Sequence, residues 1–185
     1  MAQSLKRNPN YHVAKEFGNF SDPVFRFDFS VTPDGKPFDA GKEYKLSGKN
    51  YLISQSGEGG LDYALLELKG SPGKEAPAGA AKLEQRGWIK PIAYDFQKGE
   101  PLVIVQHPKG SPQKMAFGAV VDVPAKQARI IHNVSTQEGS SGSPCLNSSL
   151  ELVALHYWGS DTKNAAIRFS AILEHLGDDR KRIET

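Results

Sequence analysis

The sequence has little cysteine, no long apolar run and no extended block of like charge. Its single cysteine, Cys145, excludes an internal disulfide framework, which favours a reducing compartment or a disulfide-free secreted protein. No apolar run approaches the roughly 18 residues that span a bilayer, and the opening residues MAQSLKRNPNYHV lack the apolar centre of a signal peptide. We therefore expect no membrane association and favour a cytoplasmic location.

The charge balance also excludes a class of partner. The net charge is +2 at pH 7, with basic and acidic residues interspersed, and the one charge run, DDRKRIE at 178–184, is typical of a solvated tail. This pattern argues against a nucleic-acid partner. With 185 residues, 38% of them hydrophobic, the chain can bury the core of one domain or of two small barrels.

Short apolar stretches separated by turn residues are abundant. Phe25, Phe27, Phe29 and Val31 alternate with polar residues, which predicts a strand over 23–31. Loops are expected at 32–44 and 71–82, and a helix at 170–179 with Gly177 just beyond it. This pattern predicts an all-β barrel or sandwich with one terminal helix. Further strands are expected at 50–55, 62–70, 87–94, 101–107, 115–123, 128–134, 150–159 and 165–170.

The stretch TQEGSSGSPCLN, residues 136–147, surrounds Ser141 with small residues. Gly139 and Gly142 permit positive φ angles, which would turn the N–H groups of Gly139 and Ser141 toward one side of the hydroxyl, as donors for an oxyanion. One alternative is a plain turn between two strands. Another, the G-x-S-x-G elbow of α/β-hydrolases, fails because Ser143 occupies its last position and no parallel sheet with helices is predicted.

A reactive serine needs a base and a group that orients the base. His12 in NYHVAKEF and Asp62 at the start of an apolar strand are the candidates. Taken alone, His12 is typical of a surface residue and Asp62 of a solvent-facing turn. The remaining histidines outside the pocket, His107, His132 and His175, are interpreted as structural.

Together TQEGSSGSP, LDYALLEL and NYHVA resemble the trypsin-like serine peptidases of the chymotrypsin fold, from about residue 10 to residue 177. The likeness is closest to their disulfide-poor bacterial and fungal branch, which includes the glutamyl endopeptidases. The chain order His, Asp, Ser is that of this fold. The resemblance implies two packed antiparallel Greek-key barrels of the six-stranded type, at 1–90 and 91–170, with a terminal helix and tail at 171–185.

The resemblance also implies the site. Ser141 would be the nucleophile, His12 the general base and acid, and Asp62 the residue that orients the imidazole, with the N–H groups of Gly139 and Ser141 as the oxyanion hole. A polypeptide substrate is implied, with no cofactor and no metal.

The sequence departs from the family at two places. Ser140 stands where trypsin has the aspartate that pairs with a new N-terminus, and only 11 residues precede His12. We therefore expect the first barrel to lack its opening strands and to expose an edge near 23–31. Three explanations stay open: a fragment, a mis-started reading frame, or a natural variant whose edge a partner covers. An incomplete barrel also leaves a second function open, an inactive trypsin-like barrel that acts as a protein-binding module.

The resemblance places the substrate pocket at Ser135, Thr136 and the segment 155–159, which includes His156. None of these residues is acidic, so a pocket for Arg or Lys is not supported. A hydroxyl and an imidazole can both donate hydrogen bonds to a carboxylate. We therefore expect Glu or Asp at P1, with a protonated His156 strengthening that preference as the pH falls. The alternative is a histidine packed in a strand.

Overall fold

The computed structural model describes residues 23–184 except 33, 55–59, 78–84, 126–127 and 161–162. The chain forms two compact units, Met1–Gly87 and Trp88–Thr185. This division lies close to the boundary expected between residues 90 and 91.

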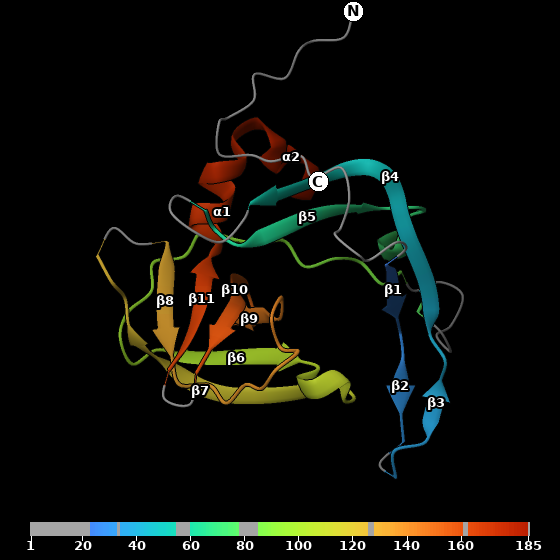
Figure 1. The fold of residues 1–185 in the computed structure, drawn as a ribbon, viewed down its shortest axis with the longest axis horizontal. Coiled ribbons are helices and arrows are strands. Elements are labelled where there is room, and N and C mark those ends of the chain that lie inside the picture. The colour runs from blue at the N-terminus through green and yellow to red at the C-terminus, as the bar shows by residue number, and fades with distance from the viewer. Residues whose placement is uncertain are drawn as a thin grey trace, which may run out of the picture. The chain divides into compact units, whose positions relative to one another are not determined.

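The second unit is a closed antiparallel β-barrel (Figure 1), whose strand order is β10-β11-β8-β7-β6-β9. Closure leaves none of these six strands with an unpaired edge. The strands are β6 (Pro101–Gln106), β7 (Lys114–Asp122), β8 (Arg129–His132), β9 (Pro144–Leu146), β10 (Leu152–Gly159) and β11 (Asn164–Arg168). The expected all-β barrel is confirmed for this unit.

Alternating side chains fill the barrel. On β8, Ile130 and His132 are fully buried, whereas Arg129 and Ile131 are partly exposed. This period of two is what a strand with one buried face produces. The inward residues form one apolar cluster that includes Leu102, Ile104, Ile130, Val134, Cys145, Val153 and Ala166.

A helix packs against the outside of the barrel. α1 (Phe169–Leu176) contacts β10 and β11 and buries Ile172 and Leu176. It ends at Gly177, whose φ of 54° is easy for glycine, so the predicted helix end is confirmed. A 3₁₀ turn (Gly177–Arg180) and the short α2 (Lys181–Glu184) follow. No helix in the described ranges is long and apolar enough to span a membrane.

The first unit holds an open sheet. β1 (Val24–Phe27), β4 (Lys42–Ser54) and β5 (Tyr63–Leu68) pair in the order β1-β4-β5. A separate two-stranded ribbon consists of β2 (Ser30–Val31) and β3 (Pro37–Asp39). Over the described residues this unit is not closed, as expected of an incomplete first barrel, and β1 lies at one edge of its sheet.

Four sequence predictions about strands were wrong. The strand expected over 23–31 is interrupted at Asp28, whose φ of 60° turns the chain between β1 and β2. The loop expected over 32–44 contains β3 and the start of β4. The strand expected over 87–94 is absent, since Pro91 has no N–H for a ladder and forms only an isolated bridge with Leu152. The three-residue β9 was not predicted.

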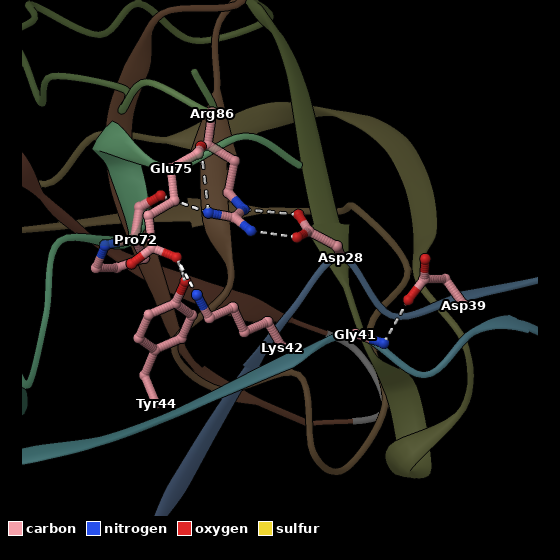
Figure 2. A network of polar contacts seen from close by, with 8 residues as sticks. All are labelled: Asp28, Asp39, Gly41, Lys42, Tyr44, Pro72, Glu75 and Arg86. Carbon is pink, nitrogen blue, oxygen red and sulfur yellow. Dashed lines mark hydrogen bonds and ion pairs between the residues drawn. The ribbon is translucent and has the colours of Figure 1, made fainter. Parts of the chain in front are cut away.

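A polar network ties the last residues of the first unit to β1 and β4 (Figure 2). The Arg86 guanidinium makes a two-pronged ion pair with the Asp28 carboxylate, with Nε 2.8 Å from Oδ1. Its Nη1 donates to the carbonyl of Pro72 at 2.5 Å. The guanidinium carbon lies 5.8 Å from the centre of the Phe27 ring. One side chain thus joins three segments that are distant in the sequence.

The Glu75 carboxylate is the second centre of this network. It accepts hydrogen bonds from the Lys42 ammonium and, at 2.7 Å, from the Tyr44 hydroxyl. These donors, Lys42 first, lower the pKa of Glu75. Gly41 starts the turn into β4 with a φ of +73°, and an added Cβ would lie 2.4 Å from the Phe27 carbonyl oxygen, so only glycine fits there.

Replacing Arg86 with alanine should destabilise the protein by about 1–3 kcal/mol, between the effects of breaking an exposed and a buried ion pair. The reason is that the Asp28 carboxylate, with only 13% of its side chain exposed, would lose its cationic partner. Urea denaturation followed by far-UV circular dichroism measures this change.

The matched control is Arg26→Ala, which breaks the Arg26–Glu43 pair. These side chains are 50% and 51% exposed, so the loss should be about 0–1 kcal/mol. Equal losses in the two variants would contradict the distinction between the two pairs.

Candidate active site

Ser141 sits in a tight double turn between β8 and β9. The Ser140 N–H donates to the Gln137 carbonyl at 3.0 Å, and the Ser143 N–H donates to the Ser140 carbonyl at 3.1 Å. Gly139 and Gly142 both have a φ of 85°, a conformation that side chains disfavour. The positive φ angles expected for these two glycines are therefore confirmed. Ser140 is fully buried, and its Oγ accepts the Gln137 N–H at 3.4 Å.

Backbone hydrogen bonds attach this turn to β10. The Gly142 N–H donates to the His156 carbonyl at 2.8 Å, and the His156 N–H donates to the Ser143 carbonyl at 2.9 Å. The exposed Ser141 hydroxyl donates to the Tyr157 carbonyl at 3.2 Å. The barrel therefore fixes the hydroxyl relative to the strand that carries His156.

Two backbone donors at the turn have no acceptor. Over the residues that the structure describes, neither the Gly139 N–H nor the Ser141 N–H donates to another group of the protein. Gly139 and Ser141 are both exposed residues, so a ligand can reach these donors from solvent. Two neighbouring donors beside a hydroxyl are therefore available to an oxygen atom of a ligand.

A cleft of about 440 Å³ adjoins Ser141. It contains two of the three residues predicted for the pocket, Thr136 and His156. Ser135 does not line it, and the carbonyl of Ser135 instead accepts a hydrogen bond from Gln106 Nε2 at 2.9 Å. The described residues that line the cleft are Thr136, Gln137, Glu138, Gly139, Ser141, His156, Tyr157, Trp158, Gly159, Ser160 and Asn164.

His156 is paired with a second buried histidine. His132 Nε2 on β8 lies 3.3 Å from His156 Nδ1 on β10, and the rings meet edge to face. His132 is fully buried and His156 is 3% exposed. Burial lowers the pKa of His132 to about 4, with a smaller contribution from His156. Burial also lowers the pKa of His156, opposed by a hydrogen bond with the backbone of Ala165. Both rings are therefore neutral at pH 7.

Sequence reasoning missed Asn164, and it placed Gly159 in the pocket segment 155–159 without assigning it a role. The Thr136 hydroxyl donates to Asn164 Oδ1 at 2.9 Å, and Asn164 Nδ2 donates to the Val134 carbonyl at 2.8 Å. A Cβ on Gly159 would lie 2.4 Å from Asn164 Oδ1 and 3.3 Å from Thr136 Oγ1. The absence of a side chain at Gly159 thus makes room for this pair. The sequence signal was only a glycine at the end of a strand.

The other two predicted catalytic residues belong to the first unit. His12 lies outside the described residues. Asp62 directly precedes β5, as predicted, with an exposed side chain and a φ of 54°. No group of three His, Cys, Asp or Glu side chains that could hold a metal ion occurs in the described part of the chain.

Comparison with known proteins identifies the family. Residues 10–155 match the family model of the trypsin-like peptidase domain. The fold is similar to that of a Glu endopeptidase solved in complex with MPD, with a TM-score of 0.56 and 17% identity over 76% of this chain and 65% of that chain. It is also similar to the inactive form of the Rv3671c protease, with a TM-score of 0.53 and 10% identity over 77% of this chain and 70% of that chain. The chain thus belongs to the trypsin-like peptidases, the serine endopeptidases of the chymotrypsin fold.

Proposed function

We propose that Ser141 is the nucleophile of this peptidase and that the adjoining cleft takes a glutamate or aspartate side chain at P1. The observation that carries the first part is the pair of free N–H donors, on Gly139 and Ser141, beside an exposed hydroxyl. His12 as general base and acid, and Asp62 as its orienting group, come from the order of these residues in the family.

The chemistry follows from these roles. The Ser141 oxygen attacks the carbonyl carbon of the scissile bond while His12 takes the hydroxyl proton. The carbonyl oxygen becomes an oxyanion, which the Gly139 and Ser141 N–H groups stabilise. His12 then gives the proton to the leaving amine, the C–N bond breaks, and an acyl-enzyme remains. Water, activated by the same histidine, releases the acid and restores Ser141.

The histidine pair supports a P1 carboxylate. His132 Nδ1 is buried and has no hydrogen-bond partner, and an orphaned acceptor is more tolerable there than an orphaned N–H. His132 therefore carries its proton on Nε2 and donates it to His156 Nδ1. This leaves the proton of His156 on Nε2, so the ring can donate to a carboxylate without being charged. A carboxylate that accepts this N–H would form a charge-assisted hydrogen bond with it.

Glu138 also lines the cleft, and its negative charge opposes an acidic P1 residue. Its side chain is exposed, so water and salt screen the repulsion. The His156 donor acts at shorter range and from a buried ring. We therefore expect Glu138 to reduce the preference for glutamate without reversing it.

Ser141→Ala should lower kcat by about 10⁶-fold, as loss of a serine nucleophile does in related chemistry. Only one exposed oxygen is removed, so the fold should be kept. The measurement is peptide hydrolysis together with labelling by a fluorophosphonate, which marks an activated serine.

Ser143→Ala is the control, because Ser143 contributes its backbone to the turn and lies two residues away. It should keep labelling and most of the turnover. A parent protein that folds but never labels would favour the alternative of a non-catalytic binding module.

The P1 preference should depend on His156. The wild type should hydrolyse matched peptides with P1 Glu at least about tenfold faster, in kcat/KM, than those with P1 Gln, since a hydrogen bond to a charged group contributes about 1.5–3 kcal/mol. His156→Ala should remove this preference. A P1 Ala peptide is the internal control, because it does not reach the donors and should be cleaved equally well by both proteins. A wild type that prefers Leu or Lys would contradict the acidic pocket while leaving Ser141 untouched.

The free energy of unfolding should decrease as the pH is lowered, because His132 is buried in its neutral form. The pKa of His132 is lowered from 6.5 to about 4, so above pH 6.5 its neutral form prevails whether the chain is folded or unfolded. Below pH 6.5 the unfolded chain binds a proton that the folded protein refuses, and the free energy of unfolding declines by about 3 kcal/mol on approaching pH 4. Urea denaturation between pH 4 and 8 should show a shallower decline in His132→Gln, whereas His107→Gln, at an exposed position, should match the wild type.

A further inference from the structure

The turn that follows β6 packs directly against the peptide that carries the Gly139 N–H. This turn, His107–Ser111, is closed by hydrogen bonds from Gly110 N–H to the His107 carbonyl at 3.2 Å and from Ser111 N–H to the Pro108 carbonyl at 2.9 Å. His107 Nδ1 lies 3.1 Å from the Ser111 carbonyl oxygen. Pro108 is buried. These bonds restrict the conformation of the turn His107–Ser111.

One hydrogen bond joins the turn His107–Ser111 to the turn that carries Ser141. The backbone N–H of Lys109 donates to the Glu138 carbonyl at 2.7 Å. A Cβ added to Gly139 would meet Lys109 N at 3.3 Å and the His107 carbonyl oxygen at 3.5 Å. The peptide between Glu138 and Gly139 thus rests on the backbone of the turn, where a side chain at 139 would crowd it.

The direction of this hydrogen bond decides where the Gly139 N–H points. The two ends of a trans peptide, the C=O and the N–H, face opposite ways. With the Glu138 oxygen held by Lys109, the Gly139 N–H must point away from the turn. If the peptide rotated by half a turn, the Glu138 oxygen would occupy the region of the donor and repel an oxyanion.

Lys109 adopts an unfavourable conformation to make this contact. Its φ and ψ are 53° and 32°, in the left-handed region that residues other than glycine disfavour. Strain of this kind persists where surrounding structure enforces it, and it concentrates at functional sites. The position before the nucleophile is the buried, uncharged Ser140, so no ion pair at this residue can orient the loop.

We propose that Lys109 is a positioning residue for the oxyanion hole, acting through its backbone N–H on the Glu138–Gly139 peptide. The ammonium group has no part in this role. The proposal rests on the proposed function of Ser141, because an oxyanion hole matters only if Ser141 forms an acyl-enzyme.

The role of Lys109 can be tested by removing its backbone N–H. Replacing Lys109 with its α-hydroxy analogue turns the Pro108–Lys109 amide into an ester and keeps the side chain. Lys109→Ala is the matched control, because it keeps the N–H and loses the ammonium. The ester protein should show a kcat at least about tenfold lower, moving toward the 10²–10³-fold loss that follows removal of an oxyanion donor, with KM changed less than twofold. Lys109→Ala should lower kcat clearly less than the ester protein does.

A second readout separates positioning from general damage. A peptide boronate forms a tetrahedral adduct on the serine and uses the oxyanion hole, whereas the corresponding peptide acid product binds the cleft without it. The ester protein should bind the boronate at least about tenfold more weakly and the product acid unchanged. An unchanged kcat in the ester protein, or equal weakening of both ligands, would overturn the proposal.

Labelling of the wild type separates the proposed role of Ser141 from the proposed role of Lys109. If fluorophosphonate fails to label Ser141 in the wild type, the proposed function and this role of Lys109 both fall. If labelling is normal and the ester protein keeps its kcat, only the role of Lys109 falls.

Discussion

The closed barrel of the second unit holds the candidate site through two backbone hydrogen bonds between the Ser141 turn and β10. Gly142 donates to His156, and His156 donates to Ser143. Because β10 is itself paired with both β9 and β11, these bonds hold the turn in a fixed position relative to the barrel. The hydroxyl, the free N–H donors and the His156 ring are therefore positioned by one element.

The same barrel also encloses the two histidines beside the cleft. A histidine facing a cleft from a solvated loop would choose its tautomer and charge according to the pH and the ligand. Here burial keeps both His132 and His156 neutral, and the unpartnered nitrogen of His132 determines which nitrogen of His156 carries its proton. The burial of His156 therefore favours a neutral ring as the donor that we propose for a P1 carboxylate, whereas the effect of its protonation on P1 preference stays a prediction.

In the first unit, polar contacts join segments of the chain that strand pairing does not connect. Its described strands form an open sheet and a small ribbon rather than a closed barrel. An ion pair between Arg86 and Asp28, and the carboxylate of Glu75 between Lys42 and Tyr44, join segments that strand pairing does not connect. Such contacts are directional, so they specify how the segment before Gly87 leaves this unit.

The sequence by itself determined the local features of this protein. The two glycines around Ser141, the alternating strands of the second barrel, the helix that ends at Gly177 and the family all follow from residue types at short spacing. The break at Asp28, the missing strand at 87–94 and the short β9 did not follow, because a left-handed residue or a three-residue strand leaves almost no periodic signal. Tertiary structure alone decided that His132 lies behind His156, that Asn164 holds Thr136 and that Lys109 supports Glu138. Each of these contacts joins strands or turns more than twenty residues apart, and only the packing of such distant segments in the tertiary structure brings these residues together.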